Sequence, residues 1–182
     1  MYKSSYKSNT PLIALILASL FACGKEQVQV PVNKIEPEQV KENLLEMNKQ
    51  FYELEEQEIN HYIDSLHLEM SRTSSGLRYH IIEKGAGDSI VGDDEVTIKY
   101  TIGPLGEEPC DKITDVVTTV KIGHTDIEKG IREAIPLMRN GGSGEFILPS
   151  VIAFGVPGKG KCINSWTPVF MKMAILEVKS GN

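Results

Sequence analysis

Apolar and polar residues alternate strictly along Val96–Ile102, and this period of two limits most what the chain can fold into. It places Val96, Ile98, Tyr100 and Ile102 on one face of a β-strand. Similar runs, bounded by turn residues, mark further strand candidates at Leu77–Ile82, Val116–Ile122, Gly144–Leu148 and Pro168–Val178. These short runs predict a small antiparallel β domain.

One amphipathic helix interrupts the strand candidates. We expect it to run from Asp126, as its cap, to Met138, and to stop at Asn140-Gly141-Gly142. Its predicted buried stripe contains Ile127, Ile131, Ala134, Ile135 and Met138. Strands with a single short helix between them indicate an α+β fold, in which a curved antiparallel sheet wraps over that helix.

An acidic block precedes the β domain. Residues 36–69 carry ten acidic and two basic side chains, and no Gly or Pro occurs between Glu38 and Gly76. We predict a long acidic helix over residues 38–72. Its apolar side chains recur at helical spacing in two stretches, Val40, Leu44, Met47, Phe51 and Leu54, then Ile59, Tyr62, Ile63 and Leu66. The stripe is either an interaction surface, such as a homodimer through residues 38–66, or a face that docks on the chain's own domain.

The first 37 residues are predicted to form an export signal followed by a tether. The apolar run Pro11–Ala22 follows a polar stretch with two lysines, and it is shorter than the roughly 20 residues that span a membrane. Cys23 follows directly, as in the lipobox of bacterial lipoproteins, so we predict lipidation at Cys23 after removal of residues 1–22. A plain secretory signal with an incidental cysteine is the alternative. Residues 23–37 are polar and are expected to form a tether.

Charge and cysteine content exclude several classes of function. The net charge is −6, so the chain lacks the basic surface that binding to nucleic acid requires. It has three cysteines and four histidines, with neither a C-x-x-C nor an H-E-x-x-H motif. We therefore expect no structural metal site.

Three stretches of the β domain resemble the same known family. The first stretch comprises Gly76-Leu77-Arg78-Tyr79, Gly85–Asp88 and Val96–Thr101. The second runs from Ile122-Gly123-His124 through Gly130 to Gly142, and the third comprises Ile147-Leu148-Pro149, Ala153-Phe154-Gly155 and Thr167–Phe170. Over residues 76–179 they resemble the FKBP-type peptidyl-prolyl cis-trans isomerases. With the signal and the acidic helix, the chain resembles the FKBP lipoproteins of Bacteroidetes-type bacteria, including the gliding-motility-associated group.

The resemblance implies a foldase that acts on proline-containing peptides or proteins, without cofactor or metal, and not on nucleic acid. It places the catalytic residues at Tyr100, Asp111 and Phe154. The residues that it implies for the substrate pocket are Cys110, Val120, Ile127, Ile131 and Met171. The lipid anchor implies a periplasmic or outer-membrane location.

The same resemblance implies weak activity. Phe154 stands at a tyrosine position of the family and lacks the hydroxyl that would donate to a bound peptide carbonyl. Ile131 replaces the tryptophan of the pocket floor, and Cys110, Val120 and Met171 replace phenylalanines. The alternative is a non-catalytic FKBP-like binding module in a membrane-associated assembly.

The family's layout also brings Cys110 and the region of Cys162 to opposite sides of the pocket rim. With Cys23 used for lipidation, these two cysteines remain, and in an oxidising compartment we expect a Cys110–Cys162 disulfide. Two buried free thiols are the alternative.

Overall fold

The computed structural model describes residues 36–123 and 127–181. The predicted signal peptide, Cys23, most of the predicted tether and the predicted cap Asp126 lie outside these ranges. Residues 42–181 belong to one compact unit; the described residues of the other, 36–41, lead into and begin helix α2 (Pro37–Ser65). Within the described ranges, no helix has both the length and the apolar character needed to cross a membrane.

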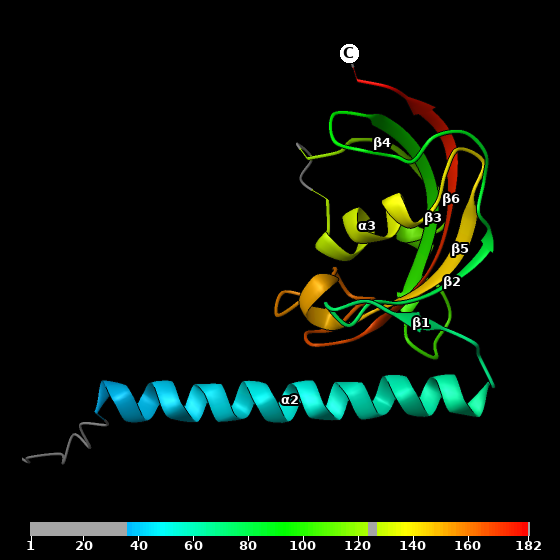
Figure 1. Cartoon of the computed structure of the whole chain (residues 1–182). Helices are drawn as coiled ribbons and strands as arrows, with labels where there is room; N and C mark the ends of the chain where they lie inside the picture. The colour runs from blue at the N-terminus through cyan, green and yellow to red at the C-terminus, as the bar shows by residue number, and fades with distance from the viewer. Residues whose placement is uncertain (1–35, 124–126, 182) are drawn as a thin grey trace, which may run out of the picture. The chain divides into compact units, whose positions relative to one another are not determined.

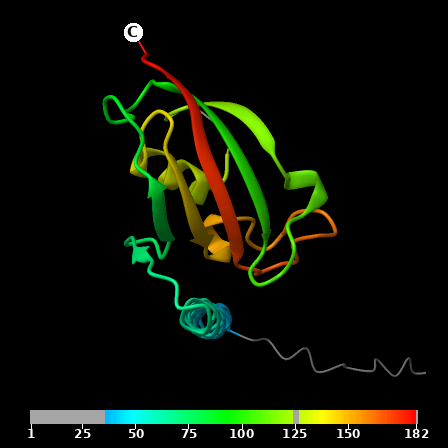
Figure 2. The same ribbon diagram turned by 90° about the vertical axis from the view of Figure 1, so that its right-hand side faces the viewer.

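In the described residues, six strands form one antiparallel sheet in the order β1-β2-β5-β6-β3-β4. Their bounds are β1 Ser71–Arg72, β2 Arg78–Glu83, β3 Glu95–Pro104, β4 Val116–Lys121, β5 Ser143–Leu148 and β6 Val169–Lys179. The sheet curves around the short helix α3 (Lys129–Ala134), as Figure 1 shows, and Figure 2 shows the strands with α3 behind them. The α+β fold predicted from the sequence is confirmed.

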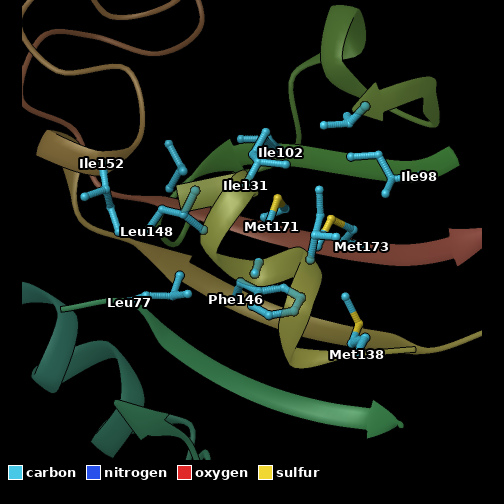
Figure 3. Close-up of a cluster of buried hydrophobic side chains, with 14 of the residues drawn as sticks. Leu77, Ile98, Ile102, Ile131, Met138, Phe146, Leu148, Ile152, Met171 and Met173 are labelled. Carbon is cyan, nitrogen blue, oxygen red and sulfur yellow. The ribbon is translucent and has the colours of Figure 1, made fainter. Parts of the chain in front are cut away.

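The core fills the space between the concave face of the sheet and α3. In the β3–β6 ladder Ile102 pairs with Met171 and Tyr100 with Met173, so the inward side chains of both strands meet the same helix. Figure 3 shows Ile102, Met171 and Met173 in one cluster with Ile131 of α3, and all four are at most 3% exposed. The apolar residues that alternate along Val96–Ile102 therefore share the face of β3 that is turned toward α3, as the sequence pattern predicted.

The predicted helix over residues 126–138 is shorter in the structure. Glu128 occupies the N-cap position of α3, and the helix gives way after Ala134 to a 3-10 turn, η3 (Ile135–Leu137). Pro136 explains this end, because it lacks the N–H that the next helical hydrogen bond needs and its ring crowds the preceding turn. The predicted stripe is nevertheless inward, since Ile131, Ala134, Ile135 and Met138 are buried and Ile127 packs against them.

The prediction that the acidic helix extends to residue 72 is wrong: α2 ends at Ser65, and Ser71–Arg72 form the unpredicted strand β1. His67 has a left-handed backbone with φ of 52°, and the Leu68 N–H bonds back to the Ile63 carbonyl at 3.0 Å. This is a Schellman-type stop. No local pattern predicts this stop, because a glycine usually occupies the position that His67 holds here.

The two apolar stretches of α2 have different environments. Ile59 is fully buried with Leu105 and Ile147, and Tyr62 and Ile63 pack against this cluster. The earlier stretch stays exposed, with side chains at 41–62% relative exposure for Val40, Leu44, Met47, Phe51 and Leu54. The second half of the helix therefore docks on its own domain, and a homodimer through residues 38–66 stays a prediction.

Polar contacts fix the docked half in register. The Arg78 guanidinium is almost completely buried, and it bonds to the Glu56 carboxylate at 2.8 Å and to the Gly76 carbonyl at 2.8 Å. The Glu55 carboxylate accepts the Ser150 backbone N–H at 2.6 Å. Removing one member of such a set leaves a buried charge without a partner, so these contacts define one docking position of the helix.

We predict that Ile59→Ala lowers the free energy of unfolding by about 2–5 kcal/mol, because it leaves a cavity under α2. The matched change Leu45→Ala, at a side chain 62% exposed, should cost less than about 0.5 kcal/mol. Urea titration followed by circular dichroism measures both variants. Equal small effects would show that the helix does not dock through Ile59.

Candidate functional site

The structure gathers most of the predicted pocket residues in one apolar cluster. Four of them are buried members of the core, Cys110, Val120, Ile131 and Met171. Three more are partly buried against it, Tyr100, Ile127 and Phe154. They come from three strands, helix α3, the segment that leads into α3 and two loops, so only the fold brings them together.

Two glycines allow the close approaches that build this cluster. A Cβ added to Gly130 would lie 2.5 Å from Leu148 Cδ2, so the glycine lets α3 come down onto β5 and bury Ile131. A Cβ added to Gly103 would lie 2.8 Å from the Pro109 Cα, so the loop after β3 can fold back along the strand. This reversal of the chain brings Cys110 beside β3, where its backbone N–H donates to the Ile102 carbonyl at 3.1 Å.

Asp111 lies at the rim and not in the cluster. It begins the 3-10 turn η2 (Asp111–Ile113), and its side chain is exposed. In the described part of the chain, no hydrogen bond joins its carboxylate to the Tyr100 hydroxyl. The structure thus places the predicted pair on neighbouring segments but does not couple them.

A disulfide joins Cys110 to Cys162, with the two Cα atoms 5.9 Å apart. It ties the turn that carries Asp111 to residues 153–167, here called the late loop, which connects η4 (Ser150–Ile152) to β6. Cys110 is buried, whereas Cys162 is exposed on the loop. The crosslink therefore holds the late loop at the rim of the cluster.

Lys159 and Glu128 also lie at this rim, and sequence reasoning missed both. The Lys159 Nζ is 3.3 Å from Glu128 Oε1 and 5.1 Å from the centroid of the Phe154 ring. A β-bridge between Lys159 and Ile163 folds the late loop into the small hairpin that sets this position. The Gly158-Lys159-Gly160 sequence marks a turn, but no local signal says which ring lies below it.

Tyr100 is the site residue with a shifted pKa. Burial raises the pKa of the Tyr100 phenol above its usual value, and the nearby negative charge of Glu128 raises it further. The phenol therefore stays protonated well above neutral pH and can donate a hydrogen bond. Tyr100 and Lys159 are described side chains of this rim that can donate hydrogen bonds.

This arrangement suits a ligand with an apolar ring and a peptide carbonyl. Ile131 and Met171 are completely buried, so a ligand meets the partly exposed Tyr100, Ile127 and Phe154 first. These side chains exclude water from whatever packs on them, and the donors at the rim can bond to a carbonyl. The apolar side chains can therefore desolvate a ligand, and the donors can recognise its carbonyl group.

No protein-family model matches the chain. Among curated proteins, it is 28% identical over 116 residues to a probable FKBP-type peptidyl-prolyl cis-trans isomerase of Haemophilus influenzae, covering 60% of this chain and 46% of that protein. It is 27% identical over 108 residues to the macrophage infectivity potentiator of Trypanosoma cruzi, covering 59% of this chain and 55% of that protein. The chain thus spans about half the length of the curated relatives it matches.

Two solved structures share the fold. FkpA from Escherichia coli superimposes with a TM-score of 0.58 at 17% identity, over 82% of this chain and 76% of its own. A peptidyl-prolyl cis-trans isomerase from Pseudomonas syringae gives a TM-score of 0.57 at 16% identity, over 70% of this chain and 96% of its own. The curated relatives support the FKBP-type peptidyl-prolyl isomerase family, and the structural likeness shows the FKBP-like fold.

We predict that losing the disulfide destabilises the domain. It closes a loop of 52 residues, for which the chain-entropy account gives a stabilisation of about 4 kcal/mol. Dithiothreitol should therefore shift the urea midpoint of the wild type to that of Cys110→Ser/Cys162→Ser and leave the double variant unchanged. A wild-type curve that dithiothreitol does not move would contradict this crosslink.

The Tyr100 pKa predicts a loss of stability in alkali. Because the phenol ionises at lower pH in the unfolded chain than in the folded one, its contribution is complete below about pH 10 and disappears as the pH rises through the folded pKa. Urea denaturation at several pH values should show a steeper decline for the wild type than for Tyr100→Phe. Parallel declines would show that the phenol is solvated.

Proposed function

We propose that the chain is an FKBP-type peptidyl-prolyl cis-trans isomerase of weak activity. One observation carries the proposal: the fold collects Tyr100, Ile127 and Phe154 over a single buried apolar cluster between the sheet and α3. The resemblance of residues 76–179 and the curated relatives support the same reaction. Its substrates would be proline-containing peptides or unfolded proteins.

Isomerisation of an X–Pro bond is favoured by an apolar surface that carries a few hydrogen-bond donors. Rotation about an X–Pro bond crosses a barrier of about 18–20 kcal/mol, because amide resonance is lost when the bond twists. The planar amide has more charge separation than the twisted one, so an apolar surface that removes water disfavours the planar state. Donors such as Tyr100 and Lys159 can then hold the peptide carbonyls. No covalent intermediate is required.

The site's own composition supports weak activity. Phe154 offers no hydroxyl to a bound peptide, and Ile131 and Met171 are covered completely, so the floor presents little open surface. Each tenfold gain in rate requires about 1.4 kcal/mol of additional stabilisation of the twisted state, and one missing hydrogen bond is worth a similar amount.

We predict that Phe154→Tyr raises kcat/KM about three- to tenfold, because the new hydroxyl can donate to the peptide carbonyl. The matched control Phe170→Tyr adds the same hydroxyl under α2, away from the cluster, and should leave the rate unchanged. A protease-coupled assay with an Ala-Leu-Pro-Phe peptide, at rising enzyme concentration, measures both. A wild-type rate equal to that of an efficient isomerase would contradict weak activity, and no rate at any concentration would contradict isomerase activity.

The second candidate function is a non-catalytic FKBP-like binding module. The uncoupled Tyr100 and Asp111 and the covered floor favour it. NMR exchange spectroscopy on a proline peptide separates the two functions, because a module shifts the peptide resonances without connecting its cis and trans forms.

We further propose that the protein is anchored through lipid on Cys23 and faces the periplasm or the outer-membrane surface, as in FKBP lipoproteins of Bacteroidetes-type bacteria. The apolar run before Cys23 supports this proposal. In cells that process lipoproteins, the wild type should partition with membranes, and Cys23→Ser should move to the soluble fraction. Membrane association of both would contradict the lipid anchor.

A homodimer through residues 38–66 completes the proposal. The exposed side chains Leu44, Leu45 and Met47 support it, because apolar surface of this kind commonly mediates association. Light scattering on the wild type and on Leu44→Ser tests it, and a monomer at every concentration would contradict it.

A further inference from the structure

A cavity of about 450 Å³ lies between α2 and the segment around η4 and the late loop. Phe51, Leu54, Glu55 and Glu58 of α2 line it on one side, and Val151 and Trp166 line it on the other. None of these residues belongs to the apolar cluster of the candidate isomerase site. A volume of this size falls in the range of ligand-binding pockets.

The walls of this cavity are apolar and open to solvent. Relative exposure is 62% for Leu54, 57% for Val151, 43% for Phe51 and 36% for Trp166. The Phe51 and Trp166 rings stack with centroids 5.6 Å apart and planes 4° apart, which makes one continuous aromatic surface. Exposed apolar surface collected around a hollow is a mark of an interaction site.

Trp166 is held there in an unfavourable backbone conformation. Its φ of 56° lies in the left-handed region, where a bulky side chain is rare. A hydrogen bond from the Trp166 backbone N–H to the Gly155 carbonyl at 3.0 Å fixes this turn of the late loop. Strain of this kind persists where the surrounding structure imposes it, and it concentrates at functional positions.

The charged groups that line the cavity are acidic, and its other polar side chains, Asn48, Tyr52 and Ser150, are neutral. Glu55 is buried and bonded to the Ser150 N–H, Glu58 is exposed at the edge, and no lysine or arginine is among the described lining residues. Residues 42–65 of α2 carry seven acidic side chains and one lysine. Burial also raises the pKa of the Glu55 carboxyl. A cation bound here would stabilise the buried Glu55 carboxylate and reduce its repulsion from the neighbouring acidic side chains.

We propose that this cavity is a second peptide-binding site, for an extended segment that carries lysine or arginine beside an apolar side chain. The apolar side chain of the peptide packs on Phe51, Leu54 and Trp166. Its cation pairs with the Glu58 carboxylate and lies near the Glu55 carboxylate. The side chains that support the proposed homodimer, Leu44, Leu45 and Met47, do not line the cavity, so a second copy is not the occupant proposed for it. The site needs no proline and is independent of the isomerase proposal.

The chain's single tryptophan makes the test direct, because Trp166 lies in the cavity. The full-length chain with Cys23→Ser is titrated with acetyl-Ala-Phe-Lys-Leu-Arg-Ala-amide, which lacks proline. We expect a saturable shift of the Trp166 emission, and we expect the same peptide with glutamates in place of Lys and Arg to give none. Raising the salt concentration should weaken binding at least fivefold, because charge pairing contributes to it.

Two variants locate the site. Glu58→Lys changes an exposed side chain and should weaken binding at least tenfold, with circular dichroism unchanged. Val117→Ala, at an exposed apolar side chain of β4 that does not line the cavity, should bind as the wild type does. No shift with the basic peptide, an equal shift with the acidic one, or unchanged affinity of Glu58→Lys would overturn the proposal. A Trp166 shift that depends on protein concentration alone and disappears in Leu44→Ala would also overturn it, in favour of a second copy.

Discussion

Gly130 lets α3 pack directly on Leu148 of β5, and this helix–sheet contact is the one on which the remaining structure depends. It buries Ile131 against Met171 and Ile102, which Figure 3 shows in one cluster, and so it closes the core of the domain. The same contact sets the position of Glu128 at the start of α3, and therefore the charge beside Tyr100 and the partner of Lys159. Stability and the candidate site thus share one set of side chains.

The late loop connects the two sites that the structure suggests. Its first part carries Phe154 and Lys159 at the apolar cluster of the candidate site, and its last part carries Trp166 into the cavity beside α2. The Cys110–Cys162 disulfide restrains it between these points. One short crosslinked segment therefore contributes side chains to both surfaces.

Helix α2 has two halves with different surroundings although acidic residues occur along its whole length. The half that contains Ile59 and Glu56 is fixed by a buried apolar contact and by the Arg78 ion pair. The half before it exposes apolar side chains that a helix in isolation would also expose.

Local sequence pattern determined the strands after residue 76, the inward face of Val96–Ile102 and the buried stripe of α3, because periodicity and turn residues act over a few positions. It also indicated the residues of the candidate cluster through their resemblance to a family. Only the tertiary structure decided that Ile59 and not Leu54 is buried, that α2 stops at Ser65, that Asp111 is not bonded to Tyr100, and that Lys159 covers Phe154. These outcomes depend on contacts between segments far apart in the chain, such as Glu55 with Ser150, which are 95 residues apart. No local pattern can specify such partners.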